Sequence, residues 1–408
     1  MDASVGGASI GRFYSSFSPN VDGPFGKGWT TSLHTAAATS WSHLVVTSAA
    51  LLLYASTGGD PISFASLGTP ASGCSASYEP ADDNTGLSIC VPASGSAAFV
   101  LTETDGPVTS FALQTGSTYI VTAVSDTATG EVTDFDTSGV GITRILPPLP
   151  PGVTNCPWNN TAVWVAGCSD LLVTYSTSRA STVTWRGFEQ PLDGSTPVFR
   201  TYDVACYRYD TNGRLIQVWD PRDNTSGYAA CGTGGAPLSA LVTGYGYDAS
   251  TGRLTSITPP GLQPWTISYD TTSGKATGVS RTHTSAFNSG ATETTTIQYN
   301  APVGSATSTD DTHPDLTETA VGTWWPIDPL VVKPIAPAYA TAVYPPGVVT
   351  TDLKNATITA MDEYGRAYMT ANYSGTGQSG WKVATQVLDP AAGAVLADEP
   401  AVVAMDQP

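Results

Sequence analysis

Acidic side chains offer the first chemistry to consider in this sequence. Two carboxylates that face each other across a cleft can hydrolyse a glycosidic bond. Three sets of neighbouring acidic residues could supply such a pair: Glu103 and Asp105, Asp134 and Asp136, and Asp310 and Asp311. Each set lies in a cluster of Asp, Thr and Gly residues that is typical of turns. We therefore expect these carboxylates to shape turns, and a secreted carbohydrate-active enzyme is the least favoured of three functional hypotheses.

Nucleophilic catalysis would need a serine or cysteine beside a histidine and an orienting carboxylate. The chain has many serines but no Gly-x-Ser-x-Gly sequence, which presents the nucleophile in one large class of hydrolases. His34 and His43 are close in sequence to Trp29 and Trp41, so we expect packed or surface histidines. The sequence therefore predicts a protein that is not an enzyme and that uses no cofactor.

Six cysteines fall into three pairs of neighbours along the chain. We expect the disulfides Cys74–Cys90, Cys156–Cys168 and Cys206–Cys231, because local bridges between loops are the simplest connectivity. Such bridges persist in oxidising compartments, which indicates an extracellular, secreted or cell-surface protein. A zinc site is the alternative, but no Cys-x-x-Cys pair is present and the four histidines are not spaced as ligands. We expect no metal.

Charge and composition narrow the choice of partners. The formal net charge is −18 with only 16 Lys and Arg residues, so nucleic acid, whose phosphates require a basic surface, is excluded as a partner. Only 12% of residues are charged, against about 25% on average, and Tyr, Trp, Thr and Gly are frequent, which favours strands. The most apolar run, 44–55, is too short to span a bilayer.

The ten tryptophans raise a second chemistry, since aromatic rings stack on sugar faces. Packing inside a β-structure accounts for the same side chains. The sequence cannot separate a carbohydrate-binding module from a packed core. The candidates for sugar contact are Trp219, Trp265, Trp324, Trp325 and Trp381.

The sequence predicts that strands and turns position these residues. Residues 10–33 predict a hairpin with a long connection, and Asp105-Gly106 and Gly116-Ser117 separate alternating strand-like runs. The segment 146–151, rich in proline, cannot lie in a central strand. We therefore place a boundary near residue 150, between an N-terminal β-rich region, 1–150, and a hairpin region with disulfide loops, 151–408.

A self-similar block in the second region is the sharpest feature of the sequence. Each copy predicts a β-hairpin in which tyrosines form one aromatic face, Asp opens the turn and Gly adopts a positive φ. A single hairpin cannot bury its apolar face, so copies must pair edge to edge. The last two Tyr-Asp pairs are 22 residues apart, and a weaker copy covers 361–367. The motif residues are Tyr209, Asp210, Gly213, Arg214 and Leu215; Tyr247, Asp248, Gly252, Arg253 and Leu254; and Tyr269, Asp270 and Gly274.

These blocks resemble the RHS/YD-repeat family, in which Tyr-Asp is followed by a short turn, Gly-Arg-Leu and a closing Asp-Pro. The copy at 209–221 fits throughout, the copy at 247 has one residue more in its turn, and the copy at 269 has Gly274-Lys275-Ala276 in place of Gly-Arg-Leu. The segment 23–29, Gly-Pro-Phe-Gly-Lys-Gly-Trp, resembles the opening of such repeat regions. The resemblance covers 1–34 and 200–390.

The resemblance implies an all-β fold, a spiralling sheet of hairpins that forms a β-shell or part of one. Family members of this kind enclose a C-terminal toxin or act in adhesion at cell surfaces. The Asp-Pro-x-Gly-Leu motif at which toxin-bearing members cleave themselves is not matched here; the nearest strings are 389–393 and 328–330. We expect a shell fragment, or a related protein without cargo on this chain.

The function expected from these observations is that of an extracellular scaffold that encloses or displays a partner or toxin. Its partners would be a protein cargo or neighbouring repeats of a longer chain. The alternative is an adhesion or carbohydrate-binding β module with a glycan as ligand. Unpaired strand edges would permit self-association.

Overall fold

The structure of the protein is a computed structural model. It describes residues 3–5, 8–34, 41–48, 50–55, 61–81, 86–104, 106–157, 161–191, 194–224, 227–232, 236, 240–283, 290–307, 309–317, 320, 337–361, 367–377, 380–385, 387–388, 395–397 and 403–404. The elements in these ranges are strands, apart from two single-turn 3-10 helices at Thr161–Val163 and Leu353–Asn355. The predicted all-β class is confirmed. Within the described ranges, no helix has the length and hydrophobicity to cross a membrane.

The chain divides into two compact units. The first comprises Met1–Asp82 with Leu87–Leu262, and the second comprises Asp83–Gly86 with Gln263–Pro408. The units therefore divide after Leu262, and the boundary expected near residue 150 does not separate them. The proline-rich segment 146–151 follows β13 (Gly141–Leu146) inside the first unit, and the strand on its other side, β14 (Ser169–Ser176), pairs directly with β13. The prolines lie in the connection, so strand pairing continues past them.

Eight strands of the first unit close into a barrel. Neighbours pair antiparallel in chain order, and the last strand returns to the first through Ile120 and His43. Leu44, Leu53 and Phe111 are fully buried among these strands. The strands are β4 (Trp41–Val46), β5 (Leu51–Ala55), β6 (Ile62–Ser66), β7 (Cys74–Pro80), β8 (Leu87–Pro92), β9 (Phe99–Glu103), β10 (Val108–Thr115) and β11 (Thr118–Ser125).

Local sequence accounts for the hairpins of this barrel. In β10, Thr109 and Phe111 are buried while Val108, Ser110 and Ala112 are partly exposed, which is the period of two that an amphipathic strand requires. The predicted turn at Gly116-Ser117 joins β10 to β11, and the two strands pair in antiparallel register. The predicted hairpin around residues 105–106 joins β9 to β10, although Asp105 itself lies outside the described residues.

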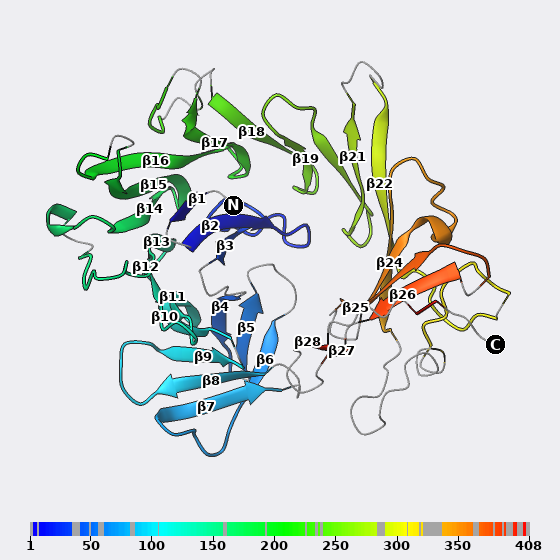
Figure 1. Cartoon of the computed structure of the whole chain (residues 1–408), viewed down its shortest axis with the longest axis horizontal. Coiled ribbons are helices and arrows are strands. Elements are labelled where there is room, and N and C mark those ends of the chain that lie inside the picture. Colours follow the sequence, from blue (N-terminus) through cyan, green and yellow to red (C-terminus); the bar gives the residue numbers. More distant parts are fainter. Residues whose placement is uncertain are drawn as a thin grey trace. The chain divides into compact units, whose positions relative to one another are not determined.

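Beyond the barrel, the first unit continues as an antiparallel sheet of successive hairpins, the green strands of Figure 1. Each strand pairs with the next along the chain. This part of the molecule matches the expected row of hairpins. Its further strands are β12 (Val132–Ser138), β15 (Arg179–Glu189), β16 (Val198–Tyr209), β17 (Leu215–Asn224), β18 (Ala240–Tyr247) and β19 (Leu254–Thr258).

The N-terminal residues form a separate small sheet of β1 (Ala3–Val5), β2 (Ala8–Tyr14) and β3 (Trp29–His34). The expected hairpin over 10–33 is present, with β2 and β3 paired from Ser9 and His34 to Tyr14 and Trp29. Figure 1 shows these dark blue strands beside the green strands of the same unit. We call residues 8–34 the N-terminal hairpin.

The second unit is a run of antiparallel strands, together with a small two-stranded sheet. Its core alternates small and large side chains, with Ala342 and Ala360 among Tyr344, Ile358 and Trp381. Strand pairing here follows chain order as well. The strands are β20 (Trp265–Tyr269), β21 (Ala276–Thr282), β22 (Thr292–Tyr299), β23 (Tyr339–Tyr344), β24 (Thr357–Met361), β25 (Ala367–Tyr373), β26 (Trp381–Thr385), β29 (Val403–Ala404) and the separate pair β27 (Val387–Leu388) and β28 (Val395–Ala397).

Candidate functional site

The repeat aspartates organise their turns through their carboxylates. In the first copy, Asp210 Oδ1 accepts the backbone N–H groups of Asn212 (2.9 Å) and Arg214 (2.8 Å), while Oδ2 accepts Arg214 Nε at 2.7 Å. The backbone closes the hairpin between Asp210 N and Arg214 O at 2.9 Å. Burial alone would raise the pKa of Asp210, but these hydrogen bonds and the guanidinium lower it overall.

The second and third copies form one common turn with one residue more. Asp248 Oδ1 accepts the backbone N–H groups of Ser250 (3.0 Å) and Thr251 (2.7 Å), together with both hydroxyls. Asp270 holds its turn in the same manner, through the backbone N–H of Ser273 at 2.6 Å. These hydrogen bonds hold the pKa of both carboxyls below the usual range. The largest contribution comes from the Ser250 hydroxyl for Asp248 and from the Ser273 backbone N–H for Asp270. The turns therefore use ionised aspartates.

The glycine of each repeat turn has a positive φ, 80° at Gly213, 76° at Gly252 and 73° at Gly274, as the motif predicts. Each of the three is also buried. At Gly213 a β-carbon would lie within 2.5 Å of the Arg179 guanidinium. The positive φ disfavours any other residue here, and a side chain would also require the Arg179 guanidinium to move.

In the first two copies, the tyrosine before the turn joins its hairpin to the preceding hairpin. Tyr209 donates its hydroxyl to the Ala180 carbonyl at 2.7 Å, and Tyr247 donates to the Leu215 carbonyl at 2.7 Å. Both acceptors lie at the start of the return strand of the hairpin before. Burial raises the pKa of Tyr247, so the hydroxyl stays protonated and remains a donor. We call this series of contacts the tyrosine ladder.

Two hairpins that the sequence reading missed share these features. Tyr175 donates to the Ile142 carbonyl at 2.8 Å, which adds one more contact to the tyrosine ladder. Asp126 accepts the backbone N–H groups of Ala128 (2.7 Å) and Thr129 (2.9 Å), as Asp248 does in its own turn. The spacing of Asp126 and Gly130 equals that of Asp248 and Gly252. A search for this spacing without the leading tyrosine would have found it.

The weaker copy expected at 361–367 cannot be compared in this way. Residues 362–366 lie outside the described residues, although β24 and β25 on either side of them pair as a hairpin.

The N-terminal hairpin lies against the repeat turns and bonds to their backbones. Lys27 N donates to the Gly213 carbonyl at 3.1 Å, and Ala180 N donates to the Pro24 carbonyl at 2.7 Å. The Tyr14 hydroxyl accepts Leu254 N at 2.9 Å. Three successive hairpins of the first unit therefore hold this one segment.

Aromatic and charged side chains extend the same contact. Trp29 Nε1 donates to the Tyr247 hydroxyl at 2.9 Å. The Arg12 guanidinium carbon lies 5.1 Å from the Trp29 ring centre, 5.5 Å from that of Tyr207 and 5.4 Å from that of Tyr245. Cation–π contacts are worth about 0.5–2 kcal/mol each according to their desolvation. The alternate tyrosines of the repeats thus form the aromatic face that the motif predicts, and the N-terminal hairpin covers it.

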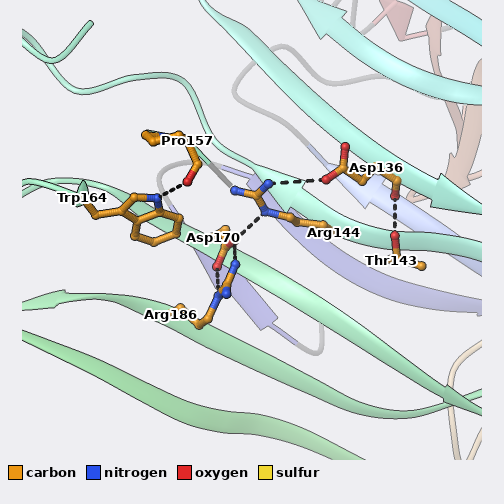
Figure 2. Close-up of polar contacts among 7 residues, drawn as sticks. All are labelled: Asp136, Thr143, Arg144, Pro157, Trp164, Asp170 and Arg186. Atoms are coloured by element: carbon orange, nitrogen blue, oxygen red, sulfur yellow. Dashed lines mark hydrogen bonds and ion pairs between the residues drawn. The ribbon is translucent and has the colours of Figure 1, made fainter. Parts of the chain in front are cut away.

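A buried cluster of charges lies on β12 to β15, as Figure 2 shows. Asp170 is fully buried and accepts Arg144 Nε at 2.5 Å and Arg186 Nη2 at 2.5 Å. Arg144 also reaches Asp136 at 3.4 Å. Trp164 lies over Arg186, with the guanidinium carbon 5.3 Å from the ring centre, and donates Nε1 to the Pro157 carbonyl at 2.8 Å. Two arginines on one carboxylate neutralise it, so the cluster suits a structural role.

All three expected disulfides are formed: Cys74–Cys90, Cys156–Cys168 and Cys206–Cys231. The second closes the loop that carries Trp164 over the charge cluster. The third ties the connection between β17 and β18 to β16.

Two of the groups considered for catalysis make structural contacts. Glu103 Oε1 accepts Trp41 Nε1 at 3.0 Å, and burial raises the pKa of its carboxyl. The His43 ring stacks on Tyr54 at 4.4 Å, as expected of a packed histidine, and burial lowers its pKa.

Three of the other carboxylates weighed for catalysis also have structural partners. Asp136 belongs to the charge cluster, and a salt bridge with Lys354 at 3.3 Å occupies Asp311. Asp310 shapes its own turn through the N–H and hydroxyl of Thr312.

Asp134 differs from these three carboxylates, because burial first and the charge of Asp136 second raise the pKa of its carboxyl. Asp105 lies outside the described residues.

The tryptophans considered for sugar binding lie mostly in cores. Trp219 is 3% exposed and Trp381 is fully buried, so neither can stack on a ligand. Trp265 is 40% exposed, and the Arg281 guanidinium carbon lies 5.0 Å from its ring centre. Trp324 and Trp325 lie outside the described residues, as do the strings 389–393 and 328–330.

The second unit also has an open depression of about 460 Å³. Gln298, His313 and Tyr344 line part of it, and the Tyr344 hydroxyl donates to Gln298 at 2.9 Å. Its lining does not bring two carboxylates together.

No protein-family model matches the chain, and no curated protein matches it. Among solved structures, it is similar to a chain of the structure described as "Crystal Structure of TcdB2-TccC3-Cdc42", with 12% sequence identity and a TM-score of 0.23. The matched region covers 85% of this chain and 20% of the other, so this chain spans about a fifth of that neighbour.

Proposed function

We propose that this protein is an extracellular structural scaffold, part of an RHS-like β-shell whose hairpin repeats enclose or display a polypeptide partner. One observation carries the proposal. The repeat hairpins already hold an extended polypeptide segment, the N-terminal hairpin, through backbone hydrogen bonds at Gly213 and Ala180 and through aromatic contacts. A surface that binds backbone and aromatic groups in this way is suited to hold chain segments of many sequences.

The extracellular location is supported by three disulfides within the first unit. Local disulfides restrict the unfolded chain and persist where the environment is oxidising. The low content of Lys and Arg agrees with partners other than nucleic acid.

A scaffold without chemistry of its own is also supported by the state of the acidic residues. Asp210, Asp248 and Asp270 serve their own turns, and Asp170 is neutralised by two arginines. Carboxylates committed to structural hydrogen bonds in this way are poor candidates for acid–base catalysis.

The experiment is chemical cross-linking of the protein purified natively from its source, with carboxylate-reactive reagents that suit its acidic surface. Mass spectrometry of the products then identifies the segments joined to the repeat hairpins. We expect cross-links from the region around 207–254 to a partner polypeptide or to further segments of the same parent chain. Products confined to contacts already present within residues 8–262, in a protein that copurifies with no partner, would contradict the proposal.

A further inference from the structure

Three aromatic side chains gather on one face of β15 and β16, apart from the tyrosine ladder. Trp185 and Tyr202 are direct partners across the two strands, with ring centres 6.1 Å apart and planes inclined by 11°. Tyr228, in the loop closed by Cys206–Cys231, places its ring 5.4 Å from that of Tyr202. Tyr228 is 46% exposed, and the other two rings are partly exposed. We call these three residues the Trp185 platform.

The platform is held in place before any ligand binds. Tyr228 accepts Asp203 N on its hydroxyl at 3.1 Å, and Asp203 Oδ2 accepts Cys231 N at 2.8 Å, which fixes the loop to β16. Tyr202 donates its hydroxyl to Glu189 Oε2 at 3.2 Å. Rigid aromatic side chains lose little conformational entropy on binding, so only a small part of the binding free energy is spent on ordering this surface.

The backbone beneath the platform leaves room for the indole. A β-carbon on Gly187, two residues beyond Trp185 on the same face, would lie 2.5 Å from the Trp185 ring. The indole therefore rests on the strand itself, where any other residue would displace it.

Polar groups flank the rings on the same face. Glu189 and Arg200 form an ion pair at 3.7 Å, and their side chains are 55% and 51% exposed. They alternate along β15 and β16 with Trp185 and Tyr202, so all four side chains lie on one side of the sheet. Flat apolar rings beside exposed hydrogen-bonding groups match a sugar, which has apolar C–H faces and hydroxyl edges.

We propose that the Trp185 platform binds the pyranose rings of a neutral oligosaccharide, with Glu189 and Arg200 hydrogen-bonding its hydroxyls. The net charge of −18 disfavours polyanionic glycans and leaves neutral ones as the class that fits. This site differs from each tryptophan that the sequence suggested for sugar contact, and it does not depend on the scaffold proposal.

The test is isothermal titration of the oxidised full chain with cellohexaose, chitohexaose and maltoheptaose. We expect at least one of these neutral probes to bind, and Trp185→Ala and Tyr228→Ala to weaken that binding about tenfold each. Trp265→Ala removes a more exposed indole from another part of the chain and is expected to leave binding unchanged. Tyr202→Phe keeps the ring and should bind within about twofold of the wild type.

Circular dichroism checks that each variant is folded, and Tyr228→Ala keeps the test decisive if Trp185→Ala does not fold, because Tyr228 is exposed. Failure of all three probes to bind the wild type overturns the proposal. So does binding that survives Tyr228→Ala. A change of oligomeric state in Tyr228→Ala, with no sugar binding by the wild type, would instead identify the platform as an interface between copies of this chain.

Discussion

Trp29 donates its indole N–H to the hydroxyl of Tyr247 over 2.9 Å, and the same hydroxyl donates to the Leu215 carbonyl at 2.7 Å. One hydroxyl thus connects the N-terminal hairpin to two successive repeat hairpins. Trp29 is 7% exposed, so its N–H has little access to water if that partner is lost. The repeat motif, read from sequence as a turn signal, is in the structure also a means of holding a second segment.

Replacing Tyr247 by Phe removes both hydrogen bonds and keeps the ring. We expect the free energy of unfolding to fall by about 1–3 kcal/mol, the cost of leaving largely buried polar groups unsatisfied. Denaturant unfolding measures it. The matched control is Tyr339→Phe, at a tyrosine that is 53% exposed, which should change stability by less than about 0.5 kcal/mol. Equal effects of the two substitutions would contradict the bridging role.

Gly26 tests the close approach of the N-terminal hairpin to the repeats. Its φ is 96°, and a β-carbon there would lie 2.8 Å from the Gly213 carbonyl oxygen and 2.9 Å from the Tyr209 ring. Gly261 has a comparable φ of 67° but open space around it. Gly26→Ala should therefore lower the melting temperature clearly more than Gly261→Ala, since only the first combines backbone strain with a steric clash. If the two variants melt together, the hairpin does not lie where the structure places it.

Asp170 tests the charge cluster. Asp170→Asn leaves Arg144 and Arg186 without their shared carboxylate, and we expect a loss of about 3–5 kcal/mol in unfolding free energy. Glu189→Gln breaks a half-exposed ion pair with Arg200 and should cost less than about 1 kcal/mol. Urea unfolding of both variants compares them. A small effect at Asp170 would mean that the cluster adds little to the fold.

The repeat turns predict an acid limit to stability. Hydrogen bonds hold the pKa values of Asp126 and Asp248 below their usual range. The largest contribution comes from the Thr129 backbone N–H for Asp126 and from the Ser250 hydroxyl for Asp248. A lowered folded-state pKa contributes stability that is complete above the unfolded value, about 3.9, and is lost as the pH falls through the folded value. The melting temperature should therefore decline below about pH 4.

Asp126→Asn and Asp248→Asn should each make that decline shallower, because an amide does not titrate. Exposed Glu131, next to the Asp126 turn, provides the control Glu131→Gln. Melting temperatures measured between about pH 2.5 and pH 5, the range in which carboxyl groups titrate, give the steepness of the decline for each variant. If the melting temperature of both aspartate variants falls with pH as steeply as that of the wild type, the repeat turns are not the source of the acid limit.

Local features of the fold could be predicted from the sequence because they depend on neighbouring residues. The Asp210 turn needs an acceptor and a residue with positive φ a few positions apart, and the three disulfides join cysteines that are neighbours along the chain. The hairpin of residues 10–33 was predicted on the same basis.

Contacts between segments far apart in the sequence could not be predicted, because no local sequence pattern indicates them. Ile120 pairs with His43 to close the barrel, and no motif marks either residue as a partner of the other. Arg144, Asp170 and Arg186 come from three strands and meet only once the sheet has formed. The Asp126 turn was missed for a different reason: Ser125 stands where the motif has tyrosine, so a search anchored on Tyr-Asp passed over it.

The Trp185 platform was missed because its rings come from two strands and a disulfide loop, and none of them lies in a tryptophan-rich stretch. The tryptophans that stood out in sequence, Trp219 and Trp381, are buried instead. Exposure of an aromatic ring depends on which face of a strand it occupies, and that is decided by long-range pairing.

The central claim is that the repeat turns hold the N-terminal hairpin as a bound segment. Hydrogen exchange of the full chain, resolved for residues 23–29 by mass spectrometry, tests it most directly, because Lys27 N–H bonds to the Gly213 carbonyl of a repeat turn. We predict that this amide exchanges as slowly as those of β17 and β18, and that Tyr247→Phe accelerates its exchange. Exchange of Lys27 at the rate of an exposed loop in the wild type would contradict the account.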